Sequence, residues 1–186
     1  MSDKTRVTAL PMPKYGKPEA RRAFYDELLR RVEEIPGVES AGVITFMPLS
    51  FSGMKFSFSV EGRTNPSDVN LPFAFYRVVS PDYFRALEIP LQRGRFFDSR
   101  DAKDSPPVMV VNRRLAEQFW PGEDPTGKRL KIGPVDSPNP WAVVIGRRQR
   151  QATRFLRRAV AGVVCAVRAG VALVDVAERS ARAHEG

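Results

Sequence analysis

Between Tyr76 and Ile145, short apolar runs alternate with turns that contain proline or glycine. The chain as a whole holds 16 prolines and 13 glycines, which end regular elements wherever they fall. This punctuation limits every helix and strand of the interval to a few residues. It predicts an α+β fold in which short strands and two short helices are joined by many turns.

Alternation and capping residues predict each element in and beside this interval. The expected strands are Phe73–Val79, Val108–Val111, Lys128–Ile132 and Trp141–Ile145. Ser80 is expected to cap a first helix, with Pro81 as its first residue. Asn112 is expected to cap a second helix over Arg113–Trp120, which Pro121-Gly122 ends.

The first 60 residues predict a β-α-β unit followed by a further strand. A helix is expected from Pro18, because apolar residues recur at helical spacing from Phe24 to Ile35 before Pro36-Gly37 stops it. The strands expected on either side are Val7–Met12 and Val38–Phe46. Lys55–Val60 alternates Phe and Val with Ser, as in a strand with one wet face.

The net charge of +9 is concentrated in residues 147–186. This tail has nine arginines, no lysine and three acids, a charge of +6, which leaves +3 for the first 146 residues. The nearly balanced domain does not indicate nucleic-acid binding.

The chain as written is expected to be soluble. Its longest uncharged apolar run, Ala159–Val167, has nine residues, whereas a membrane span needs roughly 20. The start of the sequence also lacks the apolar run of a signal peptide.

Two acidic or glycine-containing stretches come near to known binding loops without meeting their requirements. Gly122 to Arg129 (GEDPTGKR) ends in Arg where a phosphate-binding loop needs Ser or Thr, and a helix precedes it instead of a strand. It is expected to be a turn.

The spacing of three aspartates, Asp98, Asp101 and Asp104, does not fit a calcium loop. They lie three residues apart, whereas calcium loops place their ligand oxygens two residues apart, so a solvated loop or a cap is expected there.

No catalytic, cofactor or metal site can be assembled from the remaining reactive residues. Cys165 is the only cysteine, which excludes an internal disulfide, and it lies in an Ala/Val run typical of packing. His184, the only histidine, lies too near the C-terminus to be a positioned base. The chain is therefore predicted not to be an enzyme, with no cofactor.

Arginines lie among aromatic residues over one stretch, a combination that can bind single-stranded nucleic acid. The arginines are Arg77, Arg85, Arg93 and Arg95, and the aromatic residues are Tyr76, Tyr83, Phe84, Phe96 and Phe97. Because each aromatic residue falls on the predicted inward face of its element, a packed core with solvated arginines is the favoured interpretation.

The order of three blocks resembles the MacB-like periplasmic core domain of ABC transporter permeases of the MacB and FtsX type. The blocks are YRVVSPDYFRALEIPLQRGRFF, PPVMVVNRRLAEQFWPGEDPTGKRLKIG and WAVVIG, and the opening segment VTALPMPKYGKPEARRAFYDELLRRVEEIPGVESAGVITFMPLS is similar too. The resemblance is closest to the duplicated permeases of soil bacteria and covers residues 5–146.

The resemblance implies a porter-like β-α-β part with an inserted mixed α/β subdomain, outside the bacterial inner membrane. Such a domain performs no catalysis and transmits ATP-driven movement to substrates or partners outside. The implied partners are the transmembrane helices of a parent permease, a separate cytoplasmic ATPase subunit and periplasmic proteins. No nucleic acid is expected.

Residues 147–186 depart from the family, which continues with a Val-Val-Gly-Asp/Asn-Val-Arg turn and a strand. Codons for Arg147 onward, read one base later, permit Val-Gly-Asn-Val followed by Lys or Arg, and those for Arg157 to Val167 permit Asp-Glu-Pro-Ser-Pro-Glu-Leu-Tyr-Val-Pro. The hypothesis is that this tail is an out-of-frame reading, disordered or loosely helical, so that the family's returning strands are absent and the domain is a truncated fragment.

The alternative is a small soluble basic protein that binds nucleic acid through its arginine-rich tail. Binding to generic DNA that falls steeply with salt would distinguish this function from the permease domain.

Overall fold

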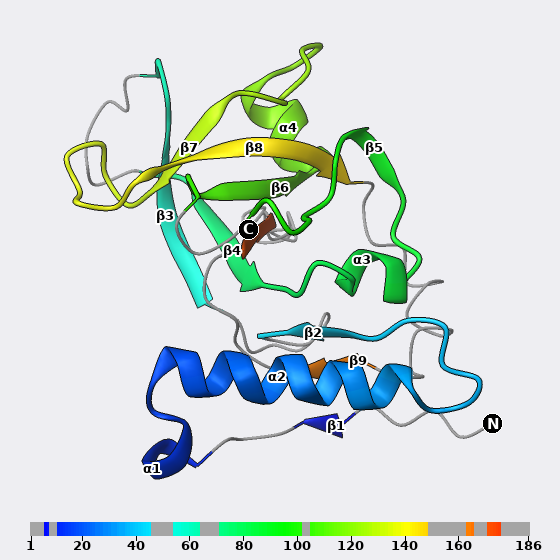
Figure 1. Cartoon of the computed structure of the whole chain (residues 1–186). Coiled ribbons are helices and arrows are strands. Elements are labelled where there is room, and N and C mark those ends of the chain that lie inside the picture. Colours follow the sequence, from blue (N-terminus) through cyan, green and yellow to red (C-terminus); the bar gives the residue numbers. More distant parts are fainter. Residues whose placement is uncertain are drawn as a thin grey trace, which may run out of the picture.

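In the computed structural model, the described residues are 6–7, 11–45, 54–63, 71–101, 105–148, 163–165 and 171–175. The elements in chain order are β1 (Arg6–Val7), α1 (Met12–Tyr15), α2 (Pro18–Glu33), β2 (Gly42–Ile44), β3 (Met54–Val60), β4 (Phe73–Val78), α3 (Tyr83–Ala86), β5 (Leu91–Gly94), β6 (Val108–Asn112), α4 (Arg113–Phe119), β7 (Arg129–Ile132), β8 (Trp141–Arg148), β9 (Val163–Cys165) and β10 (Val171–Asp175) (Figure 1). These elements form two sheets, which confirms the α+β fold class.

The smaller sheet is parallel, in the order β1-β9-β2, and α2 packs against it. Tyr25, which is buried, and its neighbours Phe24, Leu28 and Leu29 pack with Val43 of β2. Proline is favourable as the first residue of a helix, because that position needs no N–H donor, and α2 does begin at Pro18. The sheet and α2 together form a β-α-β layer, as the sequence predicts.

The larger sheet closes into a ring. Strands β8, β6, β10, β4, β3 and β7 pair in that order, and β7 pairs again with β8. β5 pairs with the last residues of β8, on the same edge as β7 and opposite β6. β8 can serve three neighbours because it is the longest strand, with β7 at its first residues and β5 at its last. Closure pairs the strands of the ring on both sides and leaves β5 as the edge.

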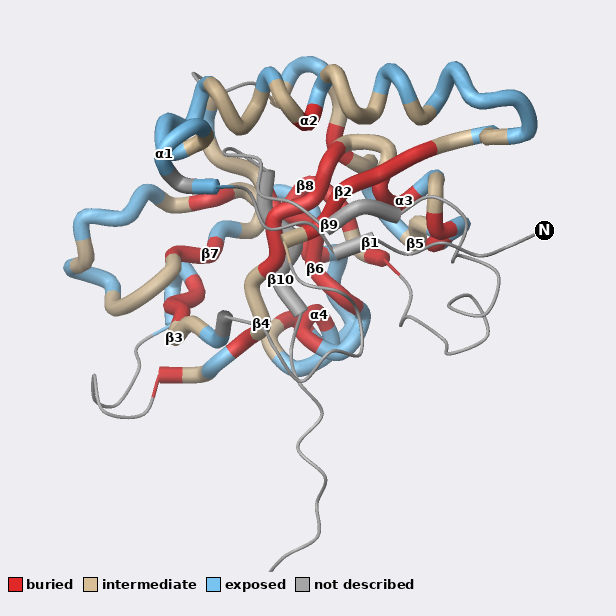
Figure 2. The backbone as a smooth tube through the Cα atoms, turned by 90° about the horizontal axis from the view of Figure 1, so that it is seen from below, coloured by how far each residue is buried: buried red, intermediate tan, exposed pale blue. Residues whose placement is uncertain are grey.

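The apolar core of this barrel is formed by alternate side chains of its strands together with apolar side chains of α4 and of Trp120. Phe58 and Val60 of β3 and Leu130 of β7 are buried in one apolar cluster with Leu115 and Trp120. Asn112 caps α4 as predicted, because its Oδ1 accepts a hydrogen bond from the Leu115 N–H at 2.8 Å. Figure 2 shows the exposed residues of α2 on one outer side and the buried ones gathered where β2 meets the barrel strands.

Several predicted boundaries differ from the structure. Of the strand expected over Val7–Met12, the structure shows Val7 in β1 and Met12 as the first residue of α1, while residues 8–10 lie outside the described residues. The strand expected over Val38–Phe46 is only Gly42–Ile44 among the described residues, because β2 is limited to the length over which β9 pairs with it. β5 was not predicted, since Leu91–Gly94 has no alternation from which to infer a strand.

Two strands lie in the tail, where the sequence predicted that returning strands would be absent. β9 pairs in parallel with both β1 and β2, and β10 lies between β4 and β6. The expectation of a disordered or helical tail is therefore wrong for Val163–Cys165 and Val171–Asp175. Short Val-rich segments favour β structure, and they can add to a sheet between two strands that are already formed. The domain boundary at residue 146 and the out-of-frame origin stay predictions.

We expect the substitution Leu173→Pro to lower the free energy of unfolding by about 3 kcal/mol, because proline cannot donate to the ladder of an interior strand. Leu173 pairs with Arg77 of β4 and Val110 of β6. Urea denaturation followed by tryptophan fluorescence measures the loss, with Ala181→Pro as the control beyond β10. An unchanged midpoint for Leu173→Pro would mean that β10 does not close the barrel.

Candidate functional site at the junction of sheet and barrel

The small sheet and the barrel are joined by a short antiparallel ladder between the end of β2 and the end of β4. The Thr45 N–H donates to the Val78 carbonyl at 2.9 Å, and the Ser80 N–H donates to the Val43 carbonyl at 2.9 Å. Between them, Ile44 and Val79 form a bridge, and neither side chain is exposed. Backbone hydrogen bonds of this ladder therefore connect the two sheets directly.

Two hydroxyl side chains reinforce this ladder. Ser80 Oγ accepts a hydrogen bond from the Val43 N–H at 3.0 Å. Thr45 Oγ1 accepts from the Val78 N–H at 2.7 Å and donates to the Val78 carbonyl at 2.9 Å. The prediction that Ser80 caps a helix is wrong, because the N-cap of α3 is Asp82 and has no side-chain cap bond. Ser80 Oγ is instead directed at β2.

α3 packs directly on β2. A Cβ atom at Gly42 would lie 2.6 Å from Tyr83 Cα, so only glycine allows the two backbones to approach this closely. Tyr83 and Phe84 are buried, as predicted from their spacing. The Phe84 ring stacks on Phe96, with centroids 4.3 Å apart and planes at 8°. The segment after β5 thus packs against α3 through this stacked pair.

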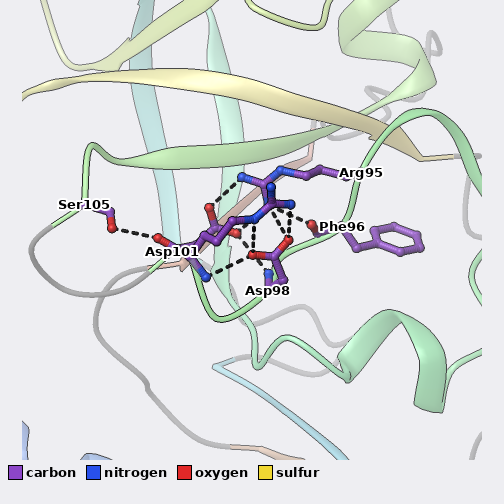
Figure 3. Close-up of polar contacts among 6 residues, drawn as sticks. Arg95, Phe96, Asp98, Asp101 and Ser105 are labelled. Atoms are coloured by element: carbon purple, nitrogen blue, oxygen red, sulfur yellow. Dashed lines mark hydrogen bonds and ion pairs between the residues drawn. The ribbon is translucent and has the colours of Figure 1, made fainter.

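A cluster of charges holds that segment in place (Figure 3). The Arg95 guanidinium donates two hydrogen bonds to the Asp101 carboxylate, at 2.7 and 2.8 Å, and a third to Asp98 at 3.2 Å. The Asp98 N–H donates to Asp101 Oδ2 at 3.0 Å, and Arg100 donates to Asp98 at 2.7 Å. We call Arg95, Asp98, Arg100 and Asp101 the arginine–aspartate clamp.

The clamp is anchored on the barrel. The Arg95 N–H donates to the Ile145 carbonyl of β8 at 2.9 Å. Gly94 and Gly146 make this approach possible: a Cβ at Gly94 would lie 2.1 Å from the Ile145 oxygen, and one at Gly146 would lie 2.3 Å from the Arg95 oxygen. Contacts therefore run without interruption from β2, through α3 and Phe96, to β8.

Hydrogen bonds from arginine keep both clamp carboxylates ionised. Hydrogen bonds from Arg95 hold the pKa of Asp101 below its usual value, and those from Arg100 lower the pKa of Asp98. The Asp101 side chain is only 3% exposed. The expectation of a solvated loop is therefore wrong for Asp101, since a buried ion pair needs the geometry that its bidentate arginine supplies. Asp104 lies outside the described residues.

The other sequence candidates are structural where the chain is described. Gly122 to Arg129 is the turn from α4 to β7, as predicted, and the Lys128 ammonium donates to Glu123 at 2.7 Å. No group of three or more potential metal ligands occurs among the described residues. His184 lies outside them, and for Cys165 the structure describes only the strand β9.

The interpretation of the arginines as solvated is correct for Arg85 and Arg93, which are exposed, and wrong for Arg77. Arg77 is 8% exposed, and its guanidinium carbon lies 5.3 Å from the centre of the Phe75 ring. Sequence reasoning missed it because outward-facing arginines of a strand are normally solvated, and the neighbouring β10 was not foreseen.

Among the described elements, no helix combines the length and the apolar composition that crossing a membrane requires. The family model of the MacB-like periplasmic core domain matches residues 2–167. A search of the curated proteins found no match.

Two solved structures are similar to the chain. The periplasmic region of MacB from Actinobacillus actinomycetemcomitans is 16% identical, with 68% of this chain and 50% of that chain covered and a TM-score of 0.48. The extracellular domain of the noncanonic ABC-type transporter YknZ from Gram-positive bacteria is 14% identical, with 81% and 61% covered and a TM-score of 0.46. The chain thus spans less than two thirds of the length of either.

We expect Ser80→Ala to lower the free energy of unfolding by about 2 kcal/mol, because it leaves the buried Val43 N–H without its side-chain acceptor. Chemical denaturation measures the change. Ser40→Ala is the matched control: its hydroxyl accepts from the exposed Arg85, so a loss below about 0.5 kcal/mol is expected. Equal losses for the two variants would refute the role assigned to Ser80.

Asp101→Asn is expected to lower the free energy of unfolding at pH 7 by about 2 kcal/mol. The lowered pKa of Asp101 means that its ionised form stabilises the folded chain. That stabilisation is complete above the unfolded-chain pKa of about 3.9 and is lost as the pH falls below it toward the folded-state value. The difference between wild type and variant should therefore shrink below about pH 4.

Denaturation curves between pH 3 and pH 7 provide the measurement. The control is Glu117→Gln, which removes an exposed pair with Arg113 and should cost less than about 0.5 kcal/mol at any pH. A pH-independent loss for Asp101→Asn would assign the effect to packing instead of charge.

Proposed function

The chain belongs to the MacB-like periplasmic core domain family, and from this membership we propose that it couples ATP-driven movement of an ABC transporter permease to molecules outside the membrane. The proposed partners are the transmembrane helices of the parent permease, a cytoplasmic ATPase subunit and periplasmic proteins. The domain lies on the extracytoplasmic side of the bacterial inner membrane in this proposal. It acts by transmitting movement and not by catalysis.

The observation that supports this role is the junction. A barrel with a close-packed core deforms little, so a displacement of the β-α-β layer is carried to the barrel as a whole only where the two are firmly joined. The ladder of Thr45 and Ser80 provides one such connection, and α3 with the arginine–aspartate clamp provides a second. Two connections at separate points resist rotation of one part against the other.

The absence of catalysis in this proposal agrees with the chemistry of the described residues. Asp98 and Asp101 are bound to arginine, which lowers the pKa of each carboxyl, so neither can donate a proton near neutral pH.

We also propose that the family-type domain ends near residue 146 and that the residues after it are read out of frame. The codon argument supports this boundary. Sequencing of the locus from independent clones is the test, and a tail supported in frame throughout would reject the boundary.

The coupling proposal is tested in the permease that carries this domain, reconstituted in vesicles with its ATPase. Ser80→Ala should leave ATP hydrolysis at or above its wild-type rate while reducing the transport that hydrolysis drives, because the junction is weakened and the nucleotide site is not.

Two controls separate coupling from stability. Val60→Ala removes buried atoms from the barrel core, away from the junction, and should destabilise the domain by a similar amount without changing the ratio of transport to hydrolysis. Ser40→Ala should behave as wild type. An unchanged ratio for Ser80→Ala, or an equal fall for Val60→Ala, contradicts the proposal.

A further inference from the structure

The ring of strands contains one position whose occupant is not needed to connect its neighbours. β10 lies between β4 and β6, antiparallel to β4 and parallel to β6. Without β10, the strands β6, β8, β7, β3 and β4 still pair in an unbroken series. These five strands form a sheet whose two edges, β4 and β6, lie on either side of the space that β10 fills. We call this space, between Phe75–Val78 and Val108–Val111, the β10 slot.

Packing as well as pairing positions the two sides of the slot. Ala74 of β4 lies in one apolar cluster with Met109 and Val111 of β6 and with Leu115 of α4. Two strands that flank a third are about 10 Å apart, twice the spacing of neighbouring strands, so the slot has room for a single strand. The pairing and packing that position the slot thus come from residues before 149.

The slot offers main-chain hydrogen bonds on both sides. Ala172 to Asp175 pair with β4, and Val171 to Val174 pair with β6. An unpaired strand edge is a template for another extended segment, and here two such edges flank one space. Backbone pairing therefore recognises the segment, and the direction of the segment is fixed because it must run parallel to β6.

The connection between β10 and the slot within one molecule is long. Residues 149–170 lie between the end of β8 and Val171, whereas the connection from β7 to β8 needs only residues 133–140. Closing a longer connection costs more entropy. The effective concentration of β10 at its own slot falls accordingly, so the same segment of a second molecule can compete for the slot when the protein is concentrated.

We propose that the β10 slot takes up the Val171–Asp175 segment of a second copy of the chain, so that two copies exchange β10. The occupant is a second copy because a segment that fits the slot in length and direction within one molecule fits it equally between two. Positions 172 and 174 are in register with Met109 and Val111 on one side and with Val78 and Tyr76 on the other. The exchanged dimer keeps all of these pairings and changes only the connection.

Sedimentation velocity on the full chain tests the exchange. The chain is unfolded in urea and refolded at concentrations that differ about a hundredfold, and the fraction of dimer should rise with concentration. Leu173→Pro should abolish the dimer, because proline removes the N–H that an interior strand donates. Ala181→Pro, beyond β10, is the matched control and should form dimers as the wild type does.

A peptide probe separates the slot from other contacts between copies. The probe is a fluorescein-labelled peptide of residues 170–177, and its control has the same composition in scrambled order. The full chain with Leu173→Gly should bind the probe about tenfold more tightly than the wild type in fluorescence anisotropy, because glycine weakens the resident strand and frees the slot. Leu173→Gly keeps the N–H at this position.

The unlabelled probe also tests the exchange on the wild-type chain, so the test does not depend on whether Leu173→Pro folds. An excess of this peptide during refolding should reduce the fraction of dimer, because it occupies the slots, and the scrambled peptide should not. Monomers at every concentration overturn the proposal. So do dimers that Leu173→Pro or the excess peptide leaves unchanged, and a scrambled peptide that binds as tightly as the probe.

The exchange goes beyond the proposed coupling function and can fail independently of it. Sedimentation and peptide binding need neither the permease nor its ATPase. A chain that stays monomeric would leave the ratio of transport to hydrolysis to its own test, and loss of the coupling role would leave the dimer measurable.

Discussion

The fold depends on how β2 is shared between two neighbours. Val43 faces α2 and packs with Tyr25, while Ile44 lies in the core cluster of α3 and Val79. Together with Gly42, these two residues pair with β9, and the ladder to Val78 and Ser80 begins at the end of β2. A strand buried on both faces tolerates few changes, which makes this short segment the structural centre of the molecule.

The barrel meets the junction through β8 and the glycines beside it. Gly94 and Gly146 bring the backbones of β5 and β8 closer than any side chain would allow. That approach places Arg95 where its N–H reaches Ile145 and its guanidinium reaches Asp101. One local constraint on backbone geometry thus positions the clamp, and the clamp positions Phe96 against Phe84.

Burial decides which of the many ion pairs matter. On α2, hydrogen bonds from Arg30 lower the pKa of Glu27 to about 2, yet Arg30 is 56% exposed and Glu27 is 44% exposed. Water and salt screen such a pair, so it adds little to stability. The Asp101 carboxylate is almost fully buried and has a bidentate arginine partner, which makes it the pair whose removal is costly.

The sequence by itself determined the class of fold, the family, the start of α2 at Pro18, the Asn112 cap and the burial of Tyr83 and Phe84. These features follow from local pattern, because helical spacing, capping and alternation act within a few residues. Tertiary structure alone decided the roles of Ser80, Arg77 and Asp101, the closure of the barrel and the places of β9 and β10. Each of these depends on a partner from a distant part of the chain, such as Val43 for Ser80 or β4 and β6 for β10, and no local pattern specifies which distant partner a residue will meet.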